Sequence, residues 1–304
     1  KKYLNQPCEY KLSEKNVLVL DIAKYRLDDG EVCESEEILR IDSKLRAKLN
    51  YPLRTDSFPQ PWLTAGEETF KHTVELFFEV KSETDIAGAE LAFEGNGITV
   101  EWNNEKVTEK SSSFFIDRCF NVVKLPLIRK GINHLTLSIP YGRKTDLEWC
   151  YITGNFGTSV KGDRAVITEP ASHLYFGDIT RQGLSFYGGN ISYILDVDVP
   201  EGNMSIEIPQ YKGALVEISL DGSDKGNIVF SPYRLDLGQV TAGKHRIELK
   251  LYGNRFNMFG QLHNANRFEK YYGPKTWRTE GIFYCYEYQL REMGILTAPL
   301  LYIN

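Results

Sequence analysis

Val74-Glu-Leu-Phe-Phe-Glu-Val80 opens the stretch of sequence that decides the fold, which runs from Thr73 to Pro140. Its apolar residues recur at every second position. Further along lies Ile98-Thr-Val-Glu-Trp-Asn-Asn-Glu-Lys-Val107, in which two short apolar runs flank an Asn-Asn pair. Period-two alternation broken by a polar two-residue turn is typical of antiparallel strands joined by a hairpin. The stretch therefore predicts an antiparallel sheet.

The same order of patterns returns between Asn190 and Gly260. Alternating apolar residues fill 191–199, and Leu215-Val-Glu-Ile-Ser-Leu-Asp-Gly-Ser223 supplies a second strand and a tight turn. An internal repeat of one strand order predicts two units of the same architecture. We expect an all-β chain with two tandem β-sandwiches, the first over 67–160 and the second over 161–304.

The first 66 residues read as a lead-in segment. Asn16-Val-Leu-Val-Leu-Asp21 is an apolar run of the length of a buried strand. The region from Glu34 to Leu49 has apolar residues at helical spacing, with glutamates early and basic residues late. We expect one helix over about 34–49, ended by Asn50 and Pro52.

Composition narrows the function classes. The chain of 304 residues has a net charge of −5, and no Lys/Arg cluster has the density of a nucleic-acid face. No segment approaches the roughly 20 apolar residues of a membrane span. The five histidines include no His-x-His pair and the five cysteines no close-spaced pair. We therefore expect no nucleic-acid or membrane partner and no transition-metal site.

Two segments resemble a known module. The closing strands Lys130-Gly-Ile-Asn-His-Leu-Thr-Leu137 and Ala242-Gly-Lys-His-Arg-Ile-Glu-Leu249 resemble those of the galactose-binding-like jelly roll, which includes the sugar-binding domain of family-two glycoside hydrolases. Four further stretches are similar to the C-terminal region of large bacterial α-L-rhamnosidase-like glycoside hydrolases: Phe58–Trp62, Leu147–Gly157, Gln182–Gly189 and Gly253–Asn266. The resemblance implies two jelly-roll β-sandwiches.

The resemblance also implies a role. The chain would be a non-catalytic C-terminal accessory region that supports a catalytic domain lying upstream in the same protein and binds carbohydrate. No βα alternation here predicts the barrel that holds the catalytic carboxylates in such enzymes. Gly273-Pro-Lys-Thr-Trp277 stands where relatives often carry a Gly-Pro-His-His-like segment, so a site using those histidines is missing. Unpaired cysteines favour the cytoplasm, whereas polysaccharide-degrading relatives are often exported.

Carbohydrate binding needs an aromatic ring for stacking and polar groups for the hydroxyls. Tyr187 with Asn190 is one candidate, because glycines surround it. The other candidates crowd into the polar-aromatic tail: Arg255, Asn257, His263, Asn264, Arg267 and Trp277. The alternative for the tail is a buried polar network that pins the C-terminal strands or docks on the upstream domain.

Two other functions stay open. A self-sufficient carbohydrate-binding module would have an exposed aromatic in a cleft. A complete glycosidase would hold two facing carboxylates in one pocket, but no Asp/Glu spacing in the sequence selects a pair. No cofactor is expected. Asp221–Asn227 offers oxygen ligands for a structural calcium ion, but it lacks the spacing of an EF-hand loop and reads more simply as a hairpin turn.

Overall fold

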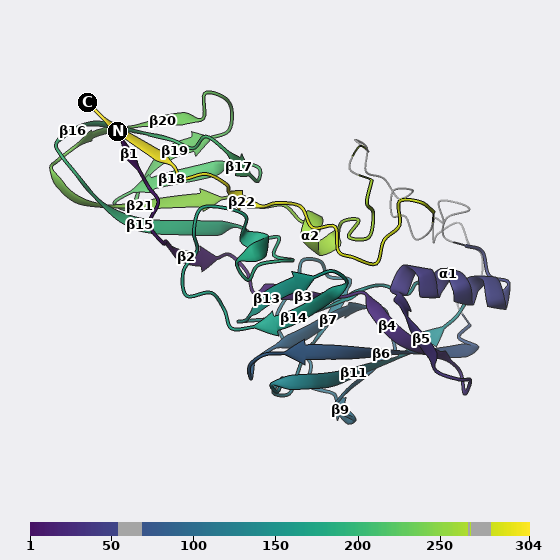
Figure 1. Ribbon diagram of the computed structural model, residues 1–304. Helices are drawn as coiled ribbons and strands as arrows, with labels where there is room; N and C mark the ends of the chain where they lie inside the picture. Colours follow the sequence, from purple (N-terminus) through teal and green to yellow (C-terminus); the bar gives the residue numbers. More distant parts are fainter. Residues whose placement is uncertain (54–68, 267, 269–280) are drawn as a thin grey trace.

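The computed structural model describes residues 1–53, 69–266, 268 and 281–304 and consists of two β-sandwiches (Figure 1). In the first sandwich, one sheet has four strands in the order β10 (Phe120–Lys124), β7 (Glu90–Glu94), β12 (Cys150–Gly154) and β3 (Asn16–Leu20). The facing sheet has eight strands. Six follow the order β13 (Gly157–Lys161), β14 (Arg164–Thr168), β6 (His72–Ser82), β11 (Gly131–Tyr141), β8 (Thr99–Trp102) and β9 (Glu105–Val107), while β4 (Ile22–Leu27) joins β6 to β5 (Cys33–Glu37).

The second sandwich also has two main sheets. One sheet has the order β1 (Lys2–Tyr3), β23 (Leu300–Ile303), β16 (Gly202–Glu207) and β20 (Arg234–Val240). The other has the order β19 (Ser223–Ile228), β18 (Val216–Leu220), β21 (Gly243–Leu251), β15 (Ile191–Val199) and β2 (Glu9–Leu12). A small ribbon adds β17 (Tyr211–Lys212) and β22 (Gly294–Ile295).

The internal repeat is visible in the strand pairings. β11 pairs with β6 and β8, and β8 pairs with β9; in the second sandwich β21 pairs in the same way with β15 and β18, and β18 with β19. The facing sheets match too, since β10-β7-β12-β3 corresponds to β20-β16-β23-β1. The prediction of an all-β chain with β-sandwiches is confirmed.

Both copies use the same hairpin chemistry. Asn103 and Asn104, between β8 and β9, have φ of 50° and 67°. Asp221 and Gly222, between β18 and β19, have φ of 51° and 78°. Positive φ at both central residues is the requirement of the tight turn that matches the twist of an antiparallel pair. Asn, Asp and Gly tolerate this conformation, which is why these residues stand at both turns.

The lead-in segment is divided between the two sandwiches. Strands β1 and β2 pair with β23 and β15, whereas β3 and β4 pair with β12 and β6. The first sandwich is thus inserted between β2 and β15 of the second one. The boundaries at residues 66 and 160 stay a prediction, but the pairings place part of 1–66 in each sandwich.

Helix α1 (Ile38–Leu49) begins later than the expected residue 34 because 33–37 are held extended by pairing with β4. The Glu37 carboxylate caps the helix by accepting the backbone N–H of Leu39 and Arg40 at 3.0 and 3.1 Å. Asn50 ends the helix in the left-handed conformation, as the sequence predicted. In the described part of the chain no helix has the length and apolar character that crossing a membrane requires.

Each sandwich has its own hydrophobic core, and the tail of the second reaches into the first. Met258 from α2 (Phe256–Phe259) and Leu262 belong to the core of the first sandwich, together with Phe186. The segment 284–290 contains no strand. It forms one isolated bridge between Tyr284 and Asn264, and the N–H groups of Cys285, Tyr288 and Gln289 donate to the carbonyl oxygens of His263, Gly162 and Leu262.

Candidate functional site

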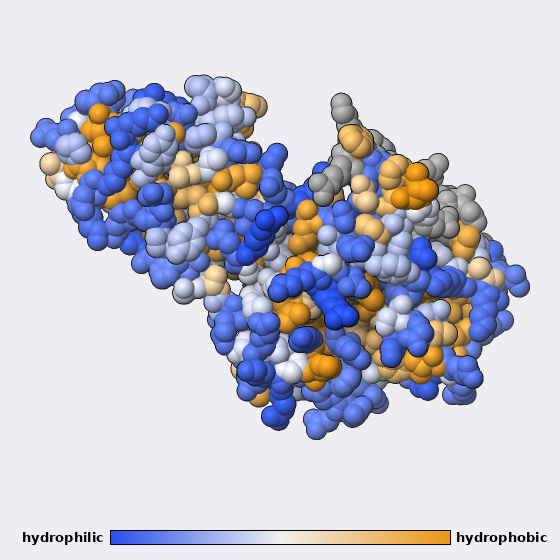
Figure 2. All heavy atoms as spheres, viewed as in Figure 1, coloured by the Kyte–Doolittle hydropathy of each residue, from blue (hydrophilic) through white to orange (hydrophobic). Residues whose placement is uncertain are grey.

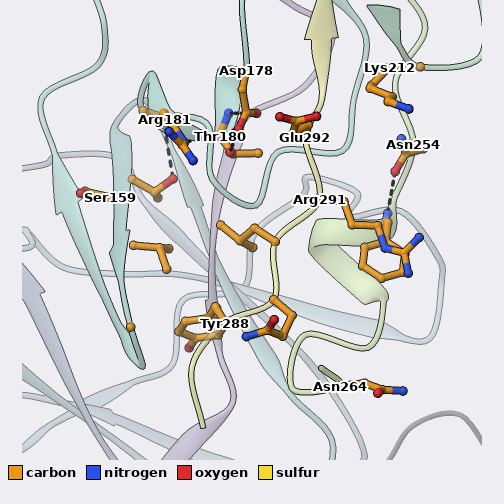
Figure 3. Close-up of a pocket in the computed structure, with 18 of the residues that line it drawn as sticks. Ser159, Asp178, Thr180, Arg181, Lys212, Asn254, Asn264, Tyr288, Arg291 and Glu292 are labelled. Atoms are coloured by element: carbon orange, nitrogen blue, oxygen red, sulfur yellow. Dashed lines mark hydrogen bonds and ion pairs between the residues drawn. The ribbon is translucent and has the colours of Figure 1, made fainter. Parts of the chain in front are cut away.

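A pocket of about 1360 Å³ lies between the two sandwiches (Figure 3). The β13–β14 hairpin and the segment 178–183 form one side, while Lys212, Gly213 and Asn254 come from the second sandwich. The C-terminal segment contributes Asn264, Asn266 and 288–292. Most of these residues end in hydroxyl, amide or charged groups, so the pocket suits a ligand with many hydrogen-bonding groups.

The first wall is rigid because β13 is tied to the segment that follows Gly177. The Thr158 backbone N–H donates to the carbonyl oxygen of Gly183 at 2.8 Å, and the Ser185 N–H donates to Thr158 Oγ1 at 3.0 Å. Ser185 Oγ in turn donates to the carbonyl oxygens of Thr158 and Thr180. These bonds leave the Ser159 side chain on the pocket side of the hairpin, where Figure 3 shows it.

Asp178 begins the short 3-10 turn η2 (Ile179–Arg181) and is occupied by local hydrogen bonds. Its Oδ1 accepts the N–H of Thr180 at 3.1 Å and of Met293 at 3.3 Å, while its Oδ2 accepts the Thr180 hydroxyl at 2.7 Å. The Arg181 Nε lies 3.8 Å from Oδ2 and its side chain is largely exposed. Asp178 therefore holds the wall together and leaves Arg181 extended at its rim.

The opposite wall is built around Phe256. The Arg291 guanidinium lies 4.1 Å from the centre of the Phe256 ring, a distance at which a cation is attracted by the ring face. The Asn257 amide fixes the backbone beneath it, because Nδ2 donates to the Arg291 carbonyl at 2.8 Å and Oδ1 accepts the Arg291 N–H at 2.9 Å. Arg291 thus stands in the pocket on a backbone held from both sides.

A buried polar network lies directly behind the pocket. The Tyr288 side chain lines the pocket and donates to Asp21 Oδ1 at 2.6 Å. His263 Nε2 lies 2.9 Å from Asp21 Oδ2, and its Nδ1 lies 3.0 Å from the carbonyl oxygen of Cys285. Both of these neighbours accept hydrogen bonds, so both ring nitrogens of His263 must carry a proton. The network therefore holds an imidazolium and a carboxylate away from water.

The charges in this network act on one another. Burial opposes the charged form of His263, but its hydrogen bond and attraction to Asp21 together raise its pKa above the usual value. Burial raises the pKa of Glu37 to about 7, although the Leu39 N–H and the Trp149 indole N–H, 2.8 Å away, favour its carboxylate. The network thus contains two groups that bind protons more tightly in the folded protein than in the unfolded chain.

The sign of the pH dependence follows from these two shifts. A raised pKa gives stability that is complete below the unfolded-state pKa and is lost as the pH rises through the folded-state pKa. We expect the free energy of unfolding to fall by about 2 kcal/mol between about pH 5 and about pH 8. Urea denaturation at a series of pH values measures it. Glu37→Gln should flatten the profile, and a stability that rises across this window would contradict the assignment.

The sequence matches no protein-family model and no curated protein. Among solved structures, a rhamnosidase from Novosphingobium sp. PP1Y aligns with a TM-score of 0.32 and 17% identity, covering 77% of this chain and 23% of its own. A β-D-mannosidase from Dictyoglomus thermophilum aligns with a TM-score of 0.31 and 12% identity, covering 78% of this chain and 31% of its own. Streptomyces avermitilis α-L-rhamnosidase, complexed with L-rhamnose, aligns with a TM-score of 0.29 and 14% identity, covering 79% of this chain and 25% of its own.

This chain therefore spans about a quarter to a third of the length of these enzymes. The similarity is distant and concerns parts of large glycoside hydrolases. It carries no argument about the pocket, whose chemistry rests on the residues described above.

The structure separates the predicted site residues. Tyr187 lies in the core of the second sandwich with no exposed surface, so its ring is not placed to stack on a sugar. Its hydroxyl donates to the Asn190 carbonyl at 2.9 Å and accepts the Ser13 N–H at 3.0 Å. The neighbouring glycines serve close packing rather than exposing backbone, since a Cβ on Gly189 would lie 2.4 Å from that hydroxyl.

The tail candidates that the structure describes make hydrogen bonds or ion pairs within the chain. Arg255 forms a two-fold ion pair with Glu14, which joins the tail to the segment between β2 and β3. Asn257 and His263 have the fixing roles described above. Asn264 lines the pocket, and its Oδ1 accepts the Asn266 N–H at 2.9 Å. Arg267 and Trp277 lie outside the described residues.

The following residues, which line the pocket between the two sandwiches, were not identified from the sequence: Asp178, Thr180, Arg181, Lys212, Asn254, Tyr288, Arg291 and Glu292. They come from separate segments, and no spacing connects them. A usable signal was the predicted boundary between residues 160 and 161, because ligand sites concentrate where two domains meet.

The carboxylates of the loop 221–227 accept hydrogen bonds that stabilise the hairpin between β18 and β19. Asp221 Oδ2 lies 2.6 Å from His245 Nδ1, and Oδ1 accepts the Arg246 N–H at 2.8 Å. Asp224 Oδ1 accepts the Gly226 N–H at 2.9 Å. Within the described ranges, no group of three or more His, Cys, Asp or Glu side chains is arranged to hold a metal ion.

Proposed function

We propose that this chain is a non-catalytic accessory region of a glycoside hydrolase and that it binds carbohydrate in the pocket between its sandwiches. The observation that carries the proposal is the lining of that pocket. Hydroxyl, amide, ammonium and guanidinium groups from both sandwiches converge on one space, and Phe256 adds an aromatic ring. Several directional donors and acceptors around one ring is the combination that recognises a sugar.

The carboxylates of the pocket favour binding over hydrolysis. Glycoside hydrolysis needs two carboxyl groups, one to protonate the leaving group and one to act as nucleophile or base. Among the described lining residues the carboxylates are Asp178 and Glu292. Both oxygens of Asp178 already accept hydrogen bonds from Thr180 and Met293, so it is poorly suited to either role. The catalytic groups would then belong to an upstream domain of the same protein.

Besides binding carbohydrate, the chain would support the upstream catalytic domain by packing against it. In the view of Figure 2, hydrophilic residues cover most of the second sandwich, while hydrophobic residues show at several places on the first. Ile282 and Phe268 are each 92% exposed in the C-terminal segment. These residues would be available to a neighbouring domain.

Binding at the pocket is tested by isothermal titration calorimetry against a panel of neutral and acidic mono- and disaccharides, after a thermal-shift screen. For a sugar that binds, Lys212→Ala and Arg291→Ala should each weaken binding by about tenfold, because each removes a charged hydrogen-bond donor. Lys11→Ala is the matched control: Lys11 is an exposed lysine on β2, outside the pocket lining, and its loss should leave affinity unchanged.

Three outcomes decide the proposal. Binding that is lost in the pocket variants alone supports it. Absence of binding across the panel, or equal losses in the Lys11→Ala control, contradicts carbohydrate recognition at this pocket. Turnover of an aryl glycoside that disappears in Glu292→Gln would instead favour a complete glycosidase.

A further inference from the structure

The outer face of the sheet β1-β23-β16-β20 carries aromatic and cationic side chains. This sheet lies at the end of the second sandwich where both chain termini are found (Figure 1). Tyr3 pairs with Leu300, and Tyr302 follows two residues later on β23, so both tyrosines point to the same side of the sheet. Leu301, next to Tyr302 on β23, is fully buried and points to the opposite side, so the tyrosines lie on the outer side, where Leu300 is covered to 6% exposure. The Tyr3 side chain is 60% exposed.

Arg234 is held on this face without a carboxylate partner. Its guanidinium lies 4.1 Å from the centre of the Tyr302 ring, and its Nε and Nη2 both donate to Ser205 Oγ, at 3.0 and 2.7 Å. Glu207 stands directly opposite Arg234 in the β16–β20 register. Yet the Glu207 carboxylate instead accepts the Tyr302 hydroxyl at 2.7 Å. The remaining guanidinium donors of Arg234 are therefore left facing solvent.

A second cation lies on the same rings. The Lys1 ammonium is 5.3 Å from the centre of Tyr302 and 5.8 Å from that of Tyr3. Neither Lys1 nor Arg234 has an ion pair with any carboxylate in the described ranges. The acid nearest in register is Glu207, but its bond to Tyr302 leaves both cations without a direct ion pair in the part of the chain that the structure describes. Charge complementarity selects an anionic ligand here.

We propose that this face is a second binding site, specific for a carbohydrate that bears a carboxylate, such as a uronic acid. The solvent-facing donors of Arg234 pair with the sugar carboxylate, assisted by the Lys1 ammonium. The exposed ring of Tyr3 stacks on the apolar face of the sugar. The second oxygen of Glu207, which does not bind Tyr302, accepts a sugar hydroxyl. This site is independent of the pocket between the sandwiches.

The chemistry favours an acidic sugar over an acidic peptide. A glutamate peptide would satisfy the two cations, and its N–H groups would donate to Glu207, but it has no ring to lie on the flat Tyr3 ring. A neutral sugar would use the ring and the acceptor and leave the cations unpaired. Only a ligand with both a carboxylate and a hydroxylated ring uses all of these groups.

The test is calorimetric titration of the whole chain with trigalacturonic acid as the probe, compared with the neutral galactose trisaccharide and with triglutamate. We expect trigalacturonic acid to bind and the other two to bind at least about tenfold more weakly. Arg234→Ala should weaken binding of trigalacturonic acid by about tenfold, and Arg234→Lys, which keeps the charge but lacks the forked donors, by about threefold.

Arg246→Ala is the matched control. Arg246 is also an exposed strand arginine of the second sandwich, but it is paired with Glu9 and Asp196 on the opposite sheet. Its loss should leave binding unchanged, and melting temperatures check that all variants fold. Equal losses in both arginine variants, equal binding of triglutamate, or no binding would overturn the proposal. Lys212→Ala should not affect this site, so its result is distinct from that of the pocket.

Discussion

Replacing Asp21 by alanine is expected to lower the free energy of unfolding by about 3 to 5 kcal/mol, the range typical of breaking a buried ion pair by removing one partner. Asp21 is fully buried where the chain passes from β3 in one sheet to β4 in the other. Its carboxylate accepts from both His263 and Tyr288. Without it, the His263 imidazolium would remain in the interior with only the Cys285 carbonyl as a close acceptor.

The measurement is urea denaturation of Asp21→Ala, His263→Ala and the double variant. The double variant should lose less than the sum of the two single losses, because the second change removes a charge that the first left without its partner. His245→Ala is the matched control, since His245 and Asp221 form a similar pair at 2.6 Å on the surface, and it should lose little. Additive losses, or equal losses in the two histidine variants, would show that the buried pair is not coupled.

Arg46→Leu should be similarly severe, lowering the free energy of unfolding by about 3 to 5 kcal/mol. Arg46 lies on α1 with a side chain that is 5% exposed. Its Nε donates to Asp42 at 2.7 Å. Its two terminal nitrogens donate to the carbonyl oxygens of Pro52, Arg143 and Thr145 and to the Asp146 carboxylate. All five guanidinium N–H groups are thereby used.

The loss arises because leucine fills part of the volume but donates to none of these acceptors, and Asp42 stays buried without Arg46. Thermal and urea denaturation measure it. Arg46→Lys keeps the charge but has one nitrogen in place of three, so it should recover only part of the stability. Lys48→Ala, two residues along the exposed side of the same helix, should be neutral. A neutral Arg46→Leu would mean that α1 docks through its apolar residues alone.

The repeat was predictable from sequence because alternation and tight-turn chemistry are local. Asn103-Asn104 and Asp221-Gly222 mark hairpins without any knowledge of their partners. The insertion of one sandwich into the other could not be predicted, because nothing local in the segment 1–15 identifies β15 and β23 as its partners. The local sequence of a short strand does not specify which sheet edge it pairs with.

The tail shows why the binding site was harder to predict from the sequence than the repeat. The tail is dense in Arg, Asn and His, and the sequence left open whether these groups bind a ligand or form a buried network; in the structure Asn257 bonds to the Arg291 backbone and His263 contacts Asp21 and the Cys285 carbonyl. Sequence density does not tell whether such groups face a ligand or a neighbouring backbone. That depends on burial, and the partners of His263, Asp21 and Cys285, come from distant parts of the chain.

The division of the N-terminal segment has a consequence for synthesis on the ribosome. Strands β1 and β2 are made before the first sandwich, but they pair with β23 and β15, which are made after it. The first sandwich has all of its own strands once β14 has emerged, next to two strands whose backbone hydrogen bonds are still open, but Phe186, Met258 and Leu262 of its core are made later. The second sandwich closes only after β23 has emerged, so its outer sheet is the last part of the two sandwiches to be completed.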